Sequence, residues 1–247
     1  MQILLGDSLF TWSLSTSKRR TLQLQVTGSL SLKLTAPPHC RPEQAEAFIR
    51  SKTAWILTTA VKLAAEEAAA ARFSLEPGTS LPFMGRQYTL SVAYHPVRPS
   101  VRLDGSLLRV CLPANQRGSQ MALQQLLNRW YVEQARQQLL QKTREWASVI
   151  GVSPVSISIR DPKTRWGSCS SRGSLNYSWR ILLAPLPVID YLVVHELCHL
   201  RQPNHSRHFW KLVESFLPAF RESRAWLKIN GGILMRLFTD VNRHKQK

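Results

Sequence analysis

The order of hydrophobic and polar residues divides the chain into segments with strand-like alternation and segments with helical spacing. Apolar and polar residues alternate through 22–26 and 30–34, on either side of Thr27-Gly28-Ser29, so a β-hairpin is predicted within residues 8–36. Further strands are predicted at 87–93, 100–103 and 107–112, with a second hairpin turn at Asp104-Gly105.

Other stretches repeat their large apolar residues every three or four positions, as one face of a helix does. Residues 42–71 are rich in Ala, Glu and Lys and predict one or two helices. Residues 120–150 predict a long amphipathic helix whose apolar stripe serves as core scaffold. Shorter strands follow at 155–160 and 174–183.

These elements predict an α+β protein in which an N-terminal region of hairpins and long helices, residues 1–150, precedes a C-terminal region, residues 151–247. Domain boundaries usually fall in linkers rich in Pro, Gly or Ser, and the long helix runs into the second region without such a linker. We therefore expect the two regions to share one core.

The most informative motif is His195-Glu196-Leu197-Cys198-His199. Residues four apart lie one turn above each other on a helix, so His195 and His199 can both reach one metal ion. Glu196 then sits beside the ion, where a hydrolytic zinc site needs a general base for the attacking water. The apolar residues before the motif predict a buried helix, in which an ionised Glu without a partner would be costly.

A catalytic zinc site needs a third protein ligand and one open position. Pro203 cannot continue the helix, so the chain must turn after Gln202 and can bring His205 back to the first two histidines. His205 is the leading candidate. His208 and Glu214 remain alternatives on the next helix, for which Ser206 is the expected N-cap.

The composition limits which binding partners and which cellular location are expected. The net charge is +18, with 18 basic against 9 acidic residues in 1–150 and 15 against 6 in 151–247, so a generally basic surface is expected. Such a surface suits nucleic acid, anionic membranes or acidic substrates, or is solvated without a specific partner. The four cysteines stand far apart, which excludes a disulfide framework and a cysteine-rich zinc module. No secretory signal or membrane span is recognised, and a cytoplasmic setting is expected.

The loop Thr164–Cys169 offers a second group of candidates. It is interpreted either as a tight turn packed by Trp166 or as a loop in which Arg165 contacts an anion or an oxyanion near the site. Asn176, on the strand that follows, is a candidate for orienting the site or contacting substrate. The strand before the motif helix is expected to border the cleft and to offer backbone groups to an extended substrate.

The chain resembles the YgjP-like metallopeptidase domain family, a minimal zincin family related to SprT-like and M48-type metallopeptidases. In the C-terminal region the resemblance rests on Arg165–Cys169, Asn176, Trp179-Arg180, Tyr191–Leu200, Asn204–Ser206 and Phe209-Trp210. Elsewhere it rests on Arg19–Leu22, Ala36-Pro37, Lys52 with Trp55-Ile56, Met84–Arg86 with Tyr88, and Arg224 with Trp226-Leu227. The resemblance implies a zincin-like core and Zn²⁺ held by His195, His199 and His205, with Glu196 as the base. His208 departs from the family pattern, and either competes for metal, assists the transition state or lies on the helix surface.

The expected function is zinc-dependent hydrolysis of a peptide bond in a protein or peptide substrate, with nucleic-acid association suggested by the charge. Two alternatives stay open. One is a metal-dependent phosphohydrolase acting on nucleotides, of the nucleoside triphosphate pyrophosphatase type, since the same activated water suits phosphate anhydrides. The other is a non-catalytic nucleic-acid-binding protein with a structural zinc site, against which the intact Glu196 argues.

Overall fold

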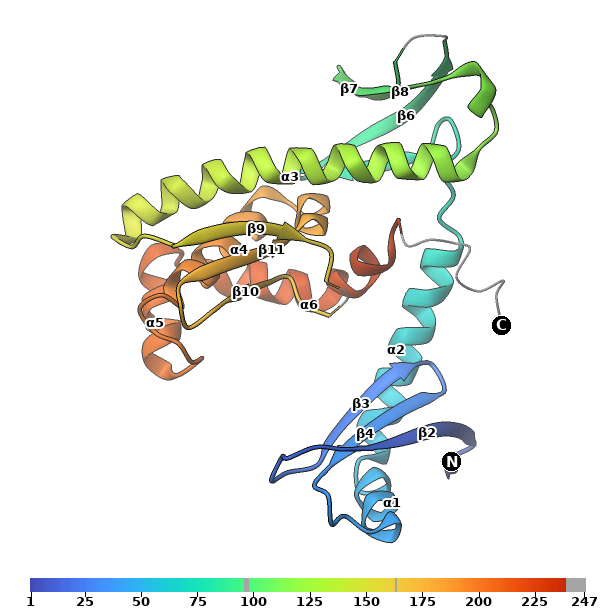
Figure 1. The fold of residues 1–247 in the computed structure, drawn as a ribbon, viewed down its shortest axis with the longest axis vertical. Helices are drawn as coiled ribbons and strands as arrows, with labels where there is room; N and C mark the ends of the chain where they lie inside the picture. Colours follow the sequence, from blue (N-terminus) through green and yellow to red (C-terminus); the bar gives the residue numbers. More distant parts are fainter. Residues whose placement is uncertain (96–97, 163, 239–247) are drawn as a thin grey trace. The chain divides into compact units, whose positions relative to one another are not determined.

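A computed structural model describes residues 1–95, 98–162 and 164–238 (Figure 1). The chain forms two compact units, Met1–Arg72 and Phe73–Lys247. The division thus falls after Arg72 and not at residue 150, because the long helix and the strands before it pack into the same hydrophobic core as the C-terminal elements. Residues 73–150 share a core with the C-terminal elements, whereas residues 1–72 have a core of their own.

The first unit is a four-stranded sheet covered by two helices. Its elements are β1 (Gln2–Leu5), β2 (Ser8–Thr16), β3 (Gln23–Gly28), β4 (Ser31–Ala36), α1 (Pro42–Arg50) and α2 (Thr53–Ala71). The predicted hairpin is confirmed as the antiparallel pair β3–β4. The sheet order is β1-β2-β4-β3, with β2 parallel to β4. Its separate core includes Phe10, Trp12, Leu34, Ile49 and Ile56.

The second unit begins with another four-stranded sheet, made of β5 (Ser80–Phe83), β6 (Arg86–Tyr94), β7 (Ser100–Asp104) and β8 (Leu107–Leu112). The expected hairpin at Asp104-Gly105 is confirmed, since β7 and β8 pair antiparallel up to Asp104 opposite Leu107. The order β5-β6-β8-β7, with β6 parallel to β8, repeats the arrangement of the first unit. Sequence alternation predicted the hairpins but not these parallel pairings.

The helix α3 (Gln120–Ile150) is the scaffold of the second unit and has the bounds predicted from the sequence. The Ser119 side chain accepts a hydrogen bond from the Ala122 N–H at its start, and Gly151 ends it in the left-handed conformation that glycine favours. Figure 1 shows α3 running along both the β5–β8 sheet and the second sheet of this unit. Its buried residues include Leu123, Leu127, Tyr131, Ala135 and Leu139.

The second sheet of this unit consists of β9 (Ser156–Arg160), β10 (Gly167–Cys169) and β11 (Ser174–Ser178), in the order β10-β11-β9. β11 is shorter than the strand predicted at 174–183, because residues Trp179–Leu183 turn into the 3₁₀ helix η2. β10, which forms a free edge of the sheet, lies where the sequence indicated only a loop.

The remaining helices are α4 (Leu186–Cys198), α5 (Arg207–Phe216) and α6 (Phe220–Arg236), and a short 3₁₀ helix, η1 (Ala114–Gln116), precedes α3. α4 packs against α3, α5 and α6. No helix in the described ranges is long and apolar enough to cross a membrane.

A polar link holds α4 in place against α3. Asp190 Oδ1 accepts hydrogen bonds from Lys142 Nζ at 2.7 Å and from Trp146 Nε1 at 3.1 Å, and both Asp190 and Lys142 are largely buried.

We expect Asp190→Asn to lower the free energy of unfolding by about 1–3 kcal/mol, because a partly buried ammonium group loses its charged partner. Urea unfolding measures this loss. The control is Glu145→Gln, whose exposed carboxylate accepts a hydrogen bond from Gln141 on the same helix. Equal effects of the two substitutions would contradict a special role for Asp190.

Candidate metal centre

The metal centre begins with two histidines at the end of α4. Pro185 precedes the helix as its N-cap and Pro187 lies in the first turn, where proline fits because those N–H groups have no helical partner. The helix body is buried, so its rotation about its own axis is fixed by packing. His195 and His199, one turn apart, place their ring centroids 4.9 Å from each other.

The loop after α4 adds His205. The Asn204 side chain accepts a hydrogen bond from the Ser206 N–H at 3.3 Å, and the Ser206 hydroxyl accepts one from the Phe209 N–H at 3.4 Å as the N-cap of α5. This cap, predicted from the sequence, is confirmed. The two bonds hold His205 between a local turn and a helix start. One ligand atom from each of His195, His199 and His205 then lies within 4.8 Å of the others.

The protonation of His195 and His199 favours metal binding. His199 Nδ1 lies 3.0 Å from the Gln202 carbonyl oxygen, so it donates its proton there and leaves Nε2 as a free lone pair. Burial lowers the pKa of His195 to about 3, with neighbouring His199 and His205 adding to the effect. Burial also lowers the pKa of His199. Neutral imidazoles at pH 7 are the form that coordinates a metal.

The donor set fits a divalent metal ion. His195 Nε2 and His205 Nε2 are 3.0 Å apart, and if both are unprotonated only a cation between them can satisfy both lone pairs. His195 Nδ1 is buried without a hydrogen-bond partner in the described residues, so it contributes no competing polar contact. The three histidines therefore form a cluster that can hold a metal ion.

Aromatic side chains from α5 surround the cluster. Phe209, fully buried, stacks on His199 at 4.4 Å between ring centroids, and Trp210 stacks on His205 at 5.5 Å. Arg224, from α6, lies over the Trp210 ring at 4.4 Å. Sequence reasoning assigned no role at the site to Arg224, because nothing in the order of residues places α6 beside α5. The rings exclude water from one side of the histidines and limit their movement.

The Glu196 carboxylate is buried directly against β10. Its side chain is 4% exposed, and burial raises its pKa to about 8. A Cβ at Gly167 would lie within 2.8 Å of Glu196 Cγ and Cδ and closer still to Oε1, so only glycine lets the strand approach this carboxylate. Trp166 anchors the same strand to α6, where a Cβ at Gly231 would lie 3.2 Å from Trp166 Nε1. The Trp166 packing predicted for this loop is confirmed.

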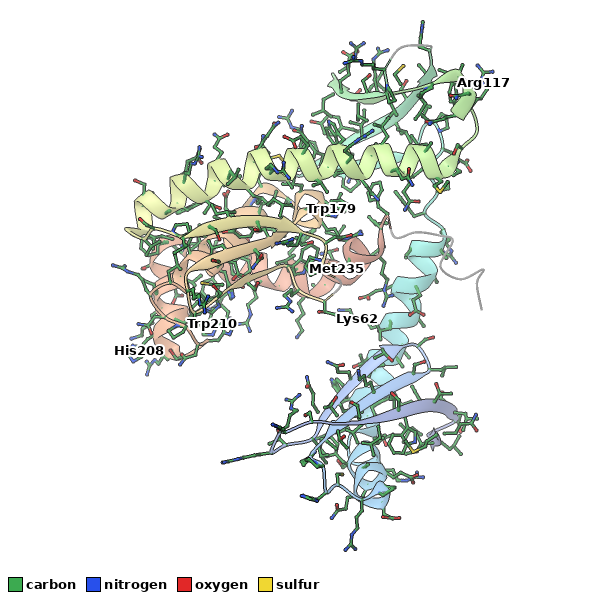
Figure 2. The ribbon with its side chains drawn as sticks, viewed as in Figure 1. Lys62, Arg117, Trp179, His208, Trp210 and Met235 are labelled. Carbon is green, nitrogen blue, oxygen red and sulfur yellow. The ribbon has the colours of Figure 1, made fainter. Side chains whose placement is uncertain are left out.

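The other sequence candidates lie outside the histidine cluster. Asn176 donates a hydrogen bond to the Ser168 hydroxyl at 3.3 Å. Because side chains alternate along a strand, both face away from the side of the sheet on which Gly167 meets Glu196. Arg165 is exposed in the loop before β10. His208 is exposed on α5, the helix that also carries Trp210 (Figure 2). Glu214 forms an ion pair with Arg221 at 2.8 Å.

A family match covers the residues of this metal centre. A profile of the YgjP-like, metallopeptidase domain matches residues 20–230, which include the histidine cluster and Glu196. Among solved structures, the crystal structure of the metallopeptidase zymogen of Pyrococcus abyssi abylysin matches with 23% sequence identity and a TM-score of 0.34. That match covers 37% of this chain and 95% of abylysin. No curated protein matches the chain.

The buried Glu196 should make the stability of the metal-free protein depend on pH. Because folding raises its pKa from 4.5 to about 8, its stabilising contribution is complete below pH 4.5 and is lost as the pH rises through about 8. Glu196→Gln should therefore stabilise the metal-free protein above about pH 8, by on the order of 5 kcal/mol at about 1.4 kcal/mol for each pKa unit. Urea unfolding in EDTA measures the difference. The gain should shrink toward pH 4.5, and a pH-independent gain would refute this origin.

The glycine on β10 should be essential for the geometry of the site. Gly167→Ala should lower kcat/KM for peptide hydrolysis by about 10- to 100-fold, because either the strand or the Glu196 carboxylate must move by about 1 Å. Gly28→Ala is the matched control, since Gly28 also lies in a strand but its added Cβ would make only an ordinary 3.7 Å contact with Ser31. Unchanged kcat/KM in Gly167→Ala would show that β10 does not position the carboxylate.

Proposed function

The chain belongs to the YgjP-like metallopeptidase domain family, and from that membership we propose that it is a zinc-dependent peptidase. The family makes it a hydrolase whose substrate class is peptides. The observation that carries the proposal for this chain is a convergence of three groups in one place. The histidine cluster, the buried Glu196 carboxylate and the free edge strand β10 meet beside α4.

His195, His199 and His205 are the proposed ligands of the zinc ion. Three neutral histidines with an open fourth position are the donor set of catalytic zinc sites. A zinc ion held there supplies a Lewis acid that polarises a carbonyl group and acidifies water. The stacking of Phe209 on His199 and of Trp210 on His205 keeps the rings oriented without supplying competing ligands.

Glu196 is the proposed general base. Its position one residue after His195 places it beside the metal-binding nitrogens and not among them. An apolar setting that raises its pKa makes the carboxylate a stronger proton acceptor than an exposed glutamate. Glu196 takes the proton of the attacking water and delivers it to the amine that leaves. Burial of the group also keeps bulk water from competing for that proton.

β10 is the proposed site of substrate alignment. It is an edge strand that pairs on one side only, with β11, so its other edge can hydrogen-bond to an extended peptide. Its first residue, Gly167, touches the general base, so a peptide paired with β10 would run directly past the carboxylate. In strand addition of this kind, the protein hydrogen-bonds mainly to the backbone of the substrate and depends less on its side chains. We therefore propose unstructured protein segments as the substrates.

The proposal is tested with purified, zinc-loaded protein acting on unfolded casein and, separately, on nucleoside triphosphates. Glu196→Gln should keep its zinc and lose about 10²- to 10⁴-fold in casein turnover, as expected for the loss of general-base catalysis. His205→Ala should retain substoichiometric zinc after dialysis. His208→Ala is the matched control, because this histidine lies on α5 outside the cluster, and it should keep both zinc and activity.

Three results would contradict parts of the proposed function. Full casein turnover by Glu196→Gln would refute the assignment of the base. Zinc loss in His208→Ala together with retention in His205→Ala would reverse the choice of third ligand. Release of phosphate or pyrophosphate that depends on Glu196, without casein cleavage, would replace the peptidase with a phosphohydrolase.

A further inference from the structure

The outer face of the β5–β8 sheet carries basic residues away from the metal centre. Alternation along the strands buries Leu90, Leu108 and Val110 against the core and turns Ser91, Arg102 and Arg109 outward. Ser91, Arg109 and Arg102 form one row across β6, β8 and β7, as the strand registers show. This face is therefore polar and basic, although nothing in the sheet fold requires arginine there.

Two arginines face each other within this row. Arg102 and Arg109 are direct partners in the antiparallel β7–β8 pair, which is the position where like charges repel most. Asp104 forms an ion pair with Arg109 at 2.5 Å, so this one acid neutralises only one of the two facing positive charges. Such a pair is destabilising in the isolated protein, and a bound anion would relieve the repulsion. The arrangement is typical of a site for phosphate.

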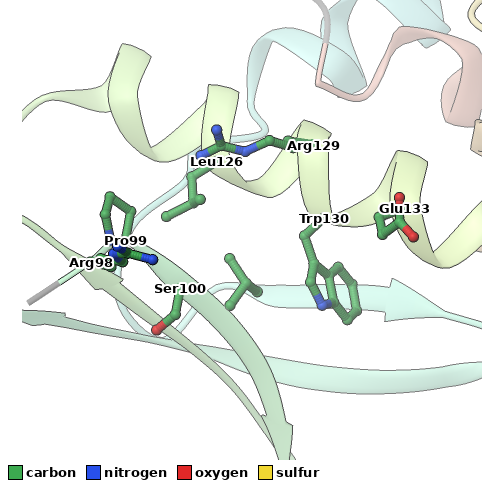
Figure 3. Close-up of a pocket in the computed structure, with 8 residues that line it drawn as sticks. Arg98, Pro99, Ser100, Leu126, Arg129, Trp130 and Glu133 are labelled. Carbon is green, nitrogen blue, oxygen red and sulfur yellow. The ribbon is translucent and has the colours of Figure 1, made fainter.

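Two hollows meet along this row. One, of about 350 Å³, lies over the sheet face and is lined by Arg102, Arg109 and Ser100 among others. The other, of about 380 Å³, lies between the edge strand β7 and α3 and is lined by Arg98, Arg129 and Trp130 (Figure 3). Ser100, at the start of β7, lines both, so the two hollows adjoin there and are together called the groove.

The residues that line the second hollow indicate which kind of ligand fits there. The half-buried Trp130 indole packs on Phe83 at 5.0 Å between ring centroids and points from α3 toward the strands, with Arg98 and Arg129 on one side of it (Figure 3). Glu133 lies at one end of this hollow, but its carboxylate is paired with Arg136 at 3.8 Å. Cations that track a charged backbone, together with an aromatic ring for a flat group, are the components of single-strand recognition.

We propose that this groove, lined by Arg98, Arg102, Arg109, Arg129 and Trp130, binds single-stranded nucleic acid. The arginines contact backbone phosphates, and a base stacks on Trp130. A double helix does not offer an unstacked base to this ring, and a membrane surface offers no flat group for it. This binding is independent of the proposed peptidase chemistry, because no groove residue belongs to the metal centre.

The first unit repeats this sheet face. In both units the outer strands pair in the same register: Gln2 lies opposite Thr11 as Ser80 lies opposite Thr89. The backbone bond from Thr11 N to Leu30 O corresponds to that from Thr89 N to Ser106 O. In the row equivalent to Ser91–Arg109–Arg102 stand Ser13, Lys33 and Gln25. This face of the first unit therefore carries one cation in the row where the second unit carries two.

The test uses full-length protein and fluorescein-labelled RNA and DNA single strands of about 20 nucleotides, long enough for more than one contact region. Fluorescence anisotropy is measured over a range of salt concentrations. Arg102→Gln with Arg109→Gln should weaken binding at least about tenfold and reduce the slope of log K against log salt by about 1.4, the value for two lost phosphate contacts. The charge-matched control is Arg20→Gln with Arg144→Gln, at two exposed positions outside the groove, which should change affinity far less.

Further variants and ligands distinguish single-strand binding from binding to duplex DNA or to a membrane. Trp130→Leu should weaken binding about tenfold and Trp130→Phe should restore most of it, as stacking requires. Equal losses in the two arginine pairs, or an absence of single-strand binding by the wild type, would overturn the proposal. Tighter arginine-dependent binding to duplex DNA or to vesicles containing phosphatidylserine would also overturn it. Casein turnover should be the same in the groove variants as in the wild type, and Glu196→Gln should bind nucleic acid normally.

Discussion

The approach of β10 to the Glu196 carboxylate is the constraint on which the rest of the metal centre depends. A helix residue and a strand backbone come so close that no side chain fits between them, and Gly167 permits the contact. The carboxylate is consequently buried, its pKa rises, and the free edge of β10 lies beside it. Burying an ionisable group without a partner costs stability. The same burial that lowers stability also raises the pKa of Glu196, as is common for reactive groups at functional sites.

The surrounding elements hold this contact from both sides. On the helix side, α4 is fixed to α3 by Asp190, which accepts hydrogen bonds from Lys142 and Trp146. On the strand side, Trp166 packs onto Gly231 of α6 with almost no free space. A site of this kind depends on sub-ångström placement, and rigid helices supply that precision better than loops do. α3 therefore contributes to the chemistry without touching the metal centre.

Local features of the fold and site could be predicted from the sequence, and long-range ones could not. The bounds of α3, the Ser206 cap and the grouping of His205 with His195 and His199 follow from periodicity, cap chemistry and the position of Pro203. The parallel pairings of the two four-stranded sheets join residues far apart in the chain, and alternation alone does not specify a partner. The roles of Gly167, Gly231 and Arg224 likewise depend on which elements come together. Because glycine has no side chain, the sequence alone does not indicate that Gly167 or Gly231 permits a close contact with another element.

The charge of the chain and the chemistry of its metal centre have separate physical origins. Burial lowers the pKa of His195 and of His199 and shields Glu196 from solvent, so the metal centre does not require the net charge of +18. In the β5–β8 sheet, arginines occupy facing positions at a cost in repulsion that folding does not demand. Residues that destabilise the free protein are best explained by a bound state in which they are neutralised. In this unit, the basic groove and the metal centre are built on different sheets joined by α3, so the proposed nucleic-acid binding and the proposed peptide hydrolysis can vary independently.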